Sequence, residues 1–227
     1  MPSQRGVMKL FLDSSDIDLI HDAVNSGLID GVTTNPSLML KQGQDPKDVI
    51  LQICQMFGWT ASVSAEVVGD TVDEMLDMAD DYIELHPSVT IKLPMSHEGL
   101  LACKELADDG ISTNVTLVFS PAQAILAAKA GATYVSPFVG RVDDNSFDGL
   151  GLIREISDIY KKHDVKTEIL AASIRNVRDV GKAFAVGADI CTIPPIVFEG
   201  MYRHMLTDNG LDKFNADWKQ LQDKLAG

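Results

Sequence analysis

Short apolar runs alternate with amphipathic stretches along most of the chain. Eight runs have the apolar, β-branched character of strands, and they cover residues 9–12, 31–35, 62–68, 90–95, 113–119, 134–138, 167–172 and 190–193. Helical patterns alternate with them at 17–27, 46–56, 71–82, 98–106, 121–130, 150–162, 177–186 and 211–225. Strands joined by helical crossovers run parallel, and eight repeats favour a (β/α)8 barrel of the α/β class over an open doubly wound sheet.

Local signals mark the ends of several of these elements. Thr71 and Glu74 have the spacing of a capping box, and Pro121 stands at the first turn of a helix that Gly131 ends. Pro36 follows the second strand, and Pro194 with Pro195 follows the eighth, where a residue without an N–H cannot continue the ladder.

The C-terminal pattern departs from the alternation because no strand follows it. Its apolar residues are spaced three or four apart and form one helical stripe, Leu211, Phe214, Trp218, Leu221 and Leu225. The stripe fits two arrangements equally, packing across its own barrel or docking on a neighbouring subunit. No linker separates a second domain, so we expect a single domain over 1–227, with a flexible extension at 1–7 and a C-terminal helix at 208–227.

Composition narrows the classes of partner. The 227 residues are 45% hydrophobic with a net charge of −14, which permits a sizeable core and argues against binding of nucleic acid or an anionic membrane. No apolar run approaches the length of a membrane span. Cys54, Cys103 and Cys191 share no disulfide or metal-ligand spacing, so we expect reduced thiols, no metal site and a cytoplasmic location.

Lys92 stands in the middle of the fourth strand-like run, between Ile91 and Leu93. A lysine there either reaches solvent at the strand end or is buried, and burial disfavours its charged form. A desolvated amine can attack a carbonyl carbon and form a Schiff base. Taken alone, the residue favours the solvent-facing alternative.

Polar residues recur inside or just beyond the ends of seven predicted strands. They are Asp13, Asn35, Glu66, Lys92, Asn114 with Thr116, Ser136, and Ser173 with Arg175. A closed barrel brings the carboxyl ends of its strands to one mouth, where these groups can share a ligand.

The set suits carbonyl chemistry on a polyhydroxylated substrate. Lys92 is the candidate nucleophile, with Asp13 and Glu66 as candidate acid and base. Arg141 and Arg175 together suit a phosphate clamp. Each residue also has a structural explanation: Asp13 and Asn35 as helix caps, and the arginines as surface charges paired with Asp143 or Asp179.

Seven ordered segments resemble the signature segments of the transaldolase family, in its small-subunit group that includes the fructose 6-phosphate aldolases. The segments are FLDS at Asp13, GVTTNPS at Asn35, SAEV at Glu66, IKLPM at Lys92, NVTLVFS at Asn114, SPFVGR at Ser136 to Arg141, and AASIR at Ser173 to Arg175. Their order matches from about Met8 to Trp218.

The resemblance implies a mechanism without metal or cofactor. Lys92 corresponds to the Schiff-base lysine, Asp13 to the acid/base at the substrate hydroxyl, and Glu66 with Thr116 to the pair that orders a catalytic water. The substrate-binding residues that it implies are Thr33, Asn35, Asn114, Ser136, Phe138, Arg141, Ser173 and Arg175.

The implied reaction belongs to the non-oxidative pentose phosphate pathway. A dihydroxyacetone unit passes from sedoheptulose 7-phosphate or fructose 6-phosphate to glyceraldehyde 3-phosphate or erythrose 4-phosphate. Glu66 and Phe138 favour transaldolase over the aldolase branch, which has Gln and Tyr there and releases free dihydroxyacetone. A non-catalytic barrel that binds sugar phosphates is the alternative of another class. The group also implies a homo-oligomer, a pentamer or decamer, with the C-terminal helix reaching a neighbour.

Overall fold

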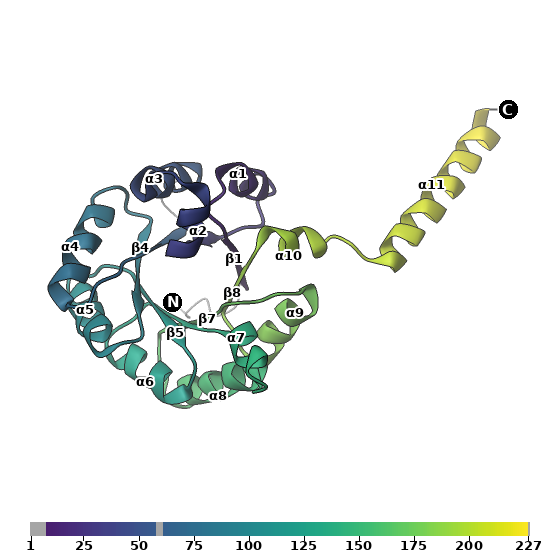
Figure 1. Cartoon of the computed structure of the whole chain (residues 1–227). Helices are drawn as coiled ribbons and strands as arrows, with labels where there is room; N and C mark the ends of the chain where they lie inside the picture. The colour runs from purple at the N-terminus through teal and green to yellow at the C-terminus, as the bar shows by residue number, and fades with distance from the viewer. Residues whose placement is uncertain (1–7, 58–60, 227) are drawn as a thin grey trace, which may run out of the picture.

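Eight parallel strands close into a barrel in which each strand pairs with the next and β1 pairs with β8 (Figure 1). The computed structural model describes residues 8–57 and 61–226, so the extension expected at 1–7 lies outside the described residues. The strands are β1 Lys9–Asp13, β2 Gly31–Thr33, β3 Ser62–Glu66, β4 Val89–Pro94, β5 Thr113–Val118, β6 Tyr134–Pro137, β7 Glu168–Ala171 and β8 Ile190–Ile193. The predicted (β/α)8 barrel is confirmed.

Helices pack around the barrel, and the C-terminal helix extends away from it (Figure 1). They are α1 Ile17–Asn25, α2 Pro36–Gln42, α3 Pro46–Phe57, α4 Val72–Ile83, α5 His97–Asp108, α6 Pro121–Lys129, α7 Val139–Asp144, α8 Gly149–Lys162, α9 Val177–Val186, α10 Pro195–Gly200 and α11 Met205–Ala226. The capping box at Thr71 and the helix start at Pro121 are confirmed.

Three short helices, α2, α7 and α10, were not predicted. Pro36 and Pro195 each end a strand region, but they also occupy the first turn of a helix, where the missing N–H has no partner to lose. The interpretation of these prolines as strand stops alone was therefore incomplete. The α7 helix has no side-chain cap, so no sequence signal marked its start.

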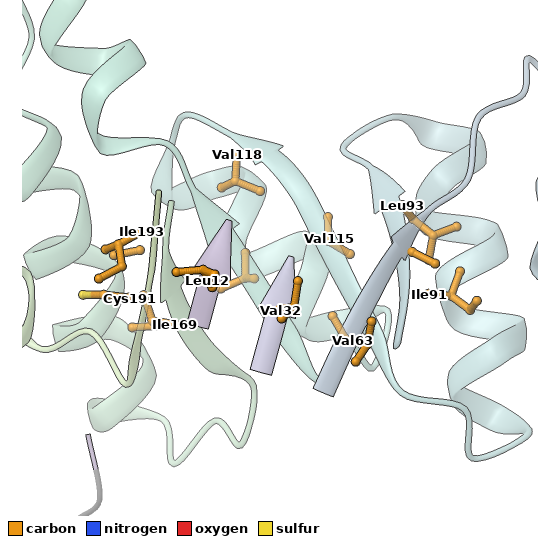
Figure 2. Packing of buried hydrophobic residues seen from close by; sticks show 14 of the residues in the cluster. Leu12, Val32, Val63, Ile91, Leu93, Val115, Val118, Ile169, Cys191 and Ile193 are labelled. Carbon is orange, nitrogen blue, oxygen red and sulfur yellow. The ribbon is translucent and has the colours of Figure 1, made fainter. Parts of the chain in front are cut away.

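Side chains alternate between the two faces of each strand, and the two faces have different compositions. One set packs against the helices; Figure 2 shows Leu12, Val32, Val63, Ile91, Leu93, Val115, Val118, Ile169, Cys191 and Ile193 from this set. The other set faces the barrel interior, where Phe11, Leu170, Ala172 and Ile190 form a small apolar cluster. Above that cluster the interior positions are polar.

Gly31 shows how tightly the interior is filled. A Cβ at this position would lie 2.5 Å from the Ser62 carbonyl oxygen and 2.8 Å from the Phe11 ring. The ring therefore occupies the space that a side chain on β2 would need, and it closes the barrel interior beneath the polar positions.

The C-terminal helix α11 extends away from the barrel (Figure 1). None of its residues is buried, and Phe214, Trp218 and Leu225 are 68%, 61% and 79% exposed. The alternative in which the apolar stripe packs across its own barrel is therefore wrong. Among the described residues, no helix combines the length and the apolar character that crossing a membrane requires.

Candidate active site

A cavity of about 350 Å³ opens at the carboxyl ends of the strands. It is lined by ten of the twelve predicted site residues: Asp13, Thr33, Asn35, Glu66, Lys92, Thr116, Ser136, Phe138, Arg141 and Ser173. Asn114 and Arg175 do not line it. A larger cavity of about 800 Å³ lies on the outer side of the barrel between α6 and α8, but its lining contains none of the predicted residues. The candidate chemistry therefore lies in the smaller cavity.

Lys92 is buried inside the barrel, with 5% of its surface exposed, so the solvent-facing alternative is wrong. Register pairing of β3 with β4 places Glu66 beside Lys92, and the Lys92 Nζ lies 2.9 Å from the Glu66 Oε2. The same Nζ donates a 2.9 Å hydrogen bond to the Thr34 carbonyl oxygen. The amine is thus desolvated but has a carboxylate partner, which limits the cost of burying its charge.

Asp13 lies at the end of β1, where Thr33 of the adjacent strand donates a 2.7 Å hydrogen bond to its Oδ1. Burial raises the pKa of Asp13, and the charge of Lys92 and the Thr33 hydrogen bond oppose that shift in part. The helix-cap explanation for Asp13 is wrong, because Asp16 caps α1. The carboxyl group is therefore free to face the cavity.

Asn35 does cap a helix, since its Oδ1 accepts a 3.0 Å hydrogen bond from the Leu38 N–H at the start of α2. It also lines the cavity, so the cap is confirmed and the residue remains available for its predicted binding role. The cap fixes the side chain through its oxygen and leaves the amide N–H₂ to donate to a ligand.

A buried hydrogen-bond network crosses the barrel beneath the cavity. Ser136 donates a 2.6 Å bond to the Asn114 Oδ1, and the Asn114 Nδ2 donates a 3.2 Å bond to the Ser64 Oγ. Asn114 therefore lies one layer below the cavity lining. The buried Thr116 Oγ1 has no hydrogen-bond partner within the described part of the chain. Such a group is costly unless a water or ligand satisfies it.

The two arginines occupy different positions. Arg141 lines the cavity, and its guanidinium carbon lies 4.8 Å from the centre of the Phe138 ring. Arg175 instead makes a two-pronged ion pair with Asp144 of α7 and remains half exposed. The predicted clamp of two arginines is therefore not assembled here, because the unpredicted α7 supplies a competing carboxylate. The pairing partner is Asp144, not Asp143 or Asp179.

Tight contacts hold α7, which carries Arg141, against the segment after β7, which carries Arg175. The Gly140 N–H donates a 3.1 Å hydrogen bond to the Ser173 carbonyl oxygen, and a Cβ on Gly140 would lie 2.3 Å from that oxygen. Ser173 itself adopts a left-handed conformation with φ of 58°. Glycine at position 140 is thus required for α7 to approach the end of β7.

The structure also places residues in the site that the sequence analysis did not identify. Thr192 lines the cavity from β8, Ser64 anchors Asn114, and Leu117 lines the cavity at a β-bulge with φ of 62°. Strand alternation was the available signal for Thr192, since it is the one polar residue in the run Ile190–Ile193. No local pattern predicts the bulge in β5.

Comparisons with known proteins identify the family of the chain. A family model described as Transaldolase/Fructose-6-phosphate aldolase matches residues 10–225. A "Probable transaldolase" from Caulobacter vibrioides is 52% identical over 211 residues, covering 93% of this chain and 96% of that protein. A "Probable transaldolase" from Paracoccus denitrificans is 48% identical over 219 residues, covering 96% of this chain and all of that protein.

A solved structure shares the fold at low sequence identity. It is a thiamine phosphate pyrophosphorylase from Pyrococcus furiosus, with a TM-score of 0.56 and 18% identity, covering 82% of this chain and 85% of that chain. This similarity concerns the fold alone.

Proposed function

This chain belongs to the transaldolase/fructose-6-phosphate aldolase family, and we propose that within it the chain acts as a transaldolase. The donor is a ketose phosphate, sedoheptulose 7-phosphate or fructose 6-phosphate, and the acceptor is an aldose phosphate, glyceraldehyde 3-phosphate or erythrose 4-phosphate. The observation that carries the proposal is the desolvated Lys92 amine, 2.9 Å from Glu66 in a polar barrel mouth that also contains Asp13.

In the proposed mechanism Glu66 takes a proton from the Lys92 ammonium, and the free amine attacks the C2 carbonyl of the donor. Glu66 returns that proton to the departing hydroxyl, and loss of water gives a protonated imine. Asp13 then accepts the proton of the C4 hydroxyl as the C3–C4 bond breaks, and the imine takes up the electron pair as an enamine. The aldose phosphate leaves, and the three-carbon unit stays bound to Lys92.

The second half of the cycle reverses these steps with a new aldehyde. The enamine carbon attacks the acceptor aldehyde, and Asp13 returns its proton to the new hydroxyl. A water held by Glu66 and Thr116 then hydrolyses the imine and frees Lys92. The unpartnered Thr116 hydroxyl supports this assignment because it has hydrogen-bonding capacity left for that water.

The phosphate group is assigned to Arg141, with Ser173 beside it in the cavity lining. Arg175 joins them when a phosphate displaces Asp144 from its guanidinium group. Both partners of this pair are half exposed, so the exchange is inexpensive. Asn35, Thr33 and Ser136 are assigned to the substrate hydroxyls and the intermediate, and Asn114 supports them from below through its hydrogen bond from Ser136.

Position 138 separates transfer from aldol cleavage. Phe138 lines the cavity without a hydroxyl group, so it offers no additional acid for releasing the three-carbon unit from the enzyme. We expect the purified protein to form sedoheptulose 7-phosphate from fructose 6-phosphate and erythrose 4-phosphate, with little free dihydroxyacetone, measured by chromatography of both products. A Phe138→Tyr, Glu66→Gln double variant provides the comparison and should shift product towards free dihydroxyacetone.

Two outcomes would contradict this proposal. Release of free dihydroxyacetone by the unaltered protein at a rate comparable with transfer would favour the aldolase alternative. Binding of sugar phosphates without transfer, and without a borohydride-trapped adduct, would favour the non-catalytic barrel.

We place the proposed reaction in the non-oxidative pentose phosphate pathway of the cytoplasm. The cysteines support a reducing compartment, because Cys54, Cys103 and Cys191 are all buried and unpaired.

We further propose that α11 docks on a neighbouring copy in a pentamer or decamer. A helix with no buried residue and an exposed apolar stripe gains little stability alone. We expect sedimentation to give an oligomer, and a Phe214→Glu, Trp218→Glu double variant to sediment near the chain mass of 24.6 kDa. Gln220→Glu, on the opposite face of α11, is the control and should leave the oligomer intact. A monomeric unaltered protein would contradict the proposal.

A further inference from the structure

Thr192 is a buried residue of β8 that is linked to the candidate acid/base group, Asp13, by hydrogen bonds through one other residue, Thr33. It is 4% exposed, and its Oγ1 lies 2.6 Å from the Thr33 Oγ1. The Thr33 Oγ1 in turn lies 2.7 Å from the Asp13 Oδ1. The three residues come from β8, β2 and β1, in which β1 pairs with both of the other strands.

The number of available protons fixes the direction of these hydrogen bonds. An ionised carboxylate only accepts, so the single hydroxyl proton of Thr33 goes to Asp13. Thr33 then has no proton left for Thr192, and the contact at 2.6 Å requires Thr192 to donate. The hydrogen bonds therefore run from Thr192 to Thr33 to Asp13.

This direction leaves one Asp13 oxygen available for chemistry. Oδ1 accepts from Thr33, while no described residue donates to Oδ2, and the side chain lines the cavity. Thr33 and Thr192 carry no charge, and Lys92 is the charged side chain that acts on the Asp13 carboxyl group. The Thr192 hydroxyl holds the Thr33 hydroxyl in the orientation that donates to Asp13. This hydrogen bond keeps the carboxylate in one rotamer and leaves its Oδ2 open to the substrate.

We propose that Thr192 is a positioning residue, which holds the Thr33 hydroxyl as a donor to Asp13 and so orients the carboxylate for proton exchange with the substrate. The inference rests on the proposed function, because it takes Asp13 as the acid/base group. The inference gives β8 a part in the reaction, although no site residue was predicted on that strand.

The test compares Thr192→Val, which removes the hydroxyl at nearly constant volume, with Thr192→Ser, which keeps it. We expect Thr192→Val to lower kcat for transfer by about 10-fold with little change in KM, and Thr192→Ser to restore most of the rate. The acidic limb of the kcat profile should move to higher pH in the valine variant, because a Thr33 hydroxyl that is free to rotate stabilises the Asp13 carboxylate less.

Thr90→Val is the matched control. Thr90 is a barrel-facing threonine that is 2% exposed, and its hydroxyl bonds the Ser62 hydroxyl at 2.8 Å in a cavity at the opposite end of the barrel. It should lose stability to a similar degree as Thr192→Val and keep the kcat and pH profile of the unaltered protein. Thr192→Ala provides a second hydroxyl-free variant if the valine variant does not fold.

A double-variant cycle separates action through Thr33 from direct contact with the substrate. If Thr192 acts through Thr33, Thr33→Val combined with Thr192→Val costs no more in kcat than Thr33→Val alone. Additive losses, a raised KM, or a Thr192→Val rate and pH profile equal to those of Thr90→Val would overturn the inference while the unaltered protein still transfers. Absence of transfer and of a trapped adduct in the unaltered protein would overturn the proposed function, and the role of Thr192 with it.

Discussion

Replacing Lys92 with methionine is expected to abolish transfer, with a loss of at least about 10⁴-fold, because the proposed covalent route is removed entirely. Methionine keeps the length of the aliphatic chain but has no amine. After incubation with fructose 6-phosphate and borohydride, intact mass spectrometry should show a three-carbon adduct on the unaltered protein that peptide mapping assigns to Lys92. The variant should show none.

Loss of activity must be separated from loss of folding. Lys92→Met leaves the largely buried Glu66, with 14% of its side chain exposed, without its partner, which costs about 3 kcal/mol of unfolding free energy. A Lys92→Met, Glu66→Gln double variant should recover much of that stability in denaturant titrations and remain inactive. Lys9→Met is the matched control, since Lys9 is also a strand lysine paired with a glutamate, Glu168, but at the other end of the barrel. Full transfer by Lys92→Met would show that the lysine is structural.

Replacing Asp13 with asparagine is expected to lower transfer by about 10²- to 10⁴-fold, the range for losing a general acid or base. Imine formation precedes C–C cleavage in the proposed mechanism, so the variant should still form an imine with the donor. Borohydride should then trap a six-carbon adduct on Lys92 in place of the three-carbon adduct. A three-carbon adduct formed at the normal rate would show that another group removes the hydroxyl proton.

The raised pKa of Asp13 gives a pH dependence with a definite sign. In the proposed mechanism, cleavage requires the carboxylate form of Asp13, so the rate should fall on the acidic side at a higher pH than an ordinary aspartate would give. The same shift makes the free energy of unfolding depend on pH, because burial favours the protonated form of Asp13 in the folded state. This stabilisation is complete below the ordinary aspartate pKa of the unfolded chain, and it is lost as the pH rises through the raised pKa of the folded protein. An asparagine at position 13 does not titrate, so the variant does not lose stability in this way. Between the two pKa values, its free energy of unfolding should therefore rise relative to that of the unaltered protein.

Much of the fold was predictable because its signals are local and repeated. Each of the eight apolar runs forms a strand, and both strand β8 and helix α9 have the predicted bounds. Strand alternation then placed Asp13, Glu66, Lys92 and Ser136 in one cavity, since all occupy interior-facing positions near strand ends.

The remaining features depend on contacts between segments that are distant in sequence. Arg175 pairs with Asp144 only because α7 folds against the loop after β7, and α7 has no capping signal of its own. The pairing of Lys92 with Glu66 depends on the register of β3 against β4. Thr192 acquires a partner only when β8 closes the barrel onto β1. Periodicity along a single segment contains none of this information.

The different compositions of the two faces of β4 also provide a way to measure whether the barrel has folded in the correct register. Ile91 and Leu93 flank Lys92 and pack against the helices, whereas Lys92 faces the interior. A slip of β4 by one residue would exchange these faces, burying the amine among aliphatic side chains and turning an isoleucine or leucine into the cavity. A molecule with β4 in the wrong register would therefore lose the packing of Ile91 and Leu93 in the core and, at the same time, the proposed nucleophile Lys92 from the cavity. Under the proposed Schiff-base mechanism, the yield of borohydride-trapped adduct per mole of chain, at saturating substrate and reductant, reports the fraction of molecules whose barrel closed in the correct register.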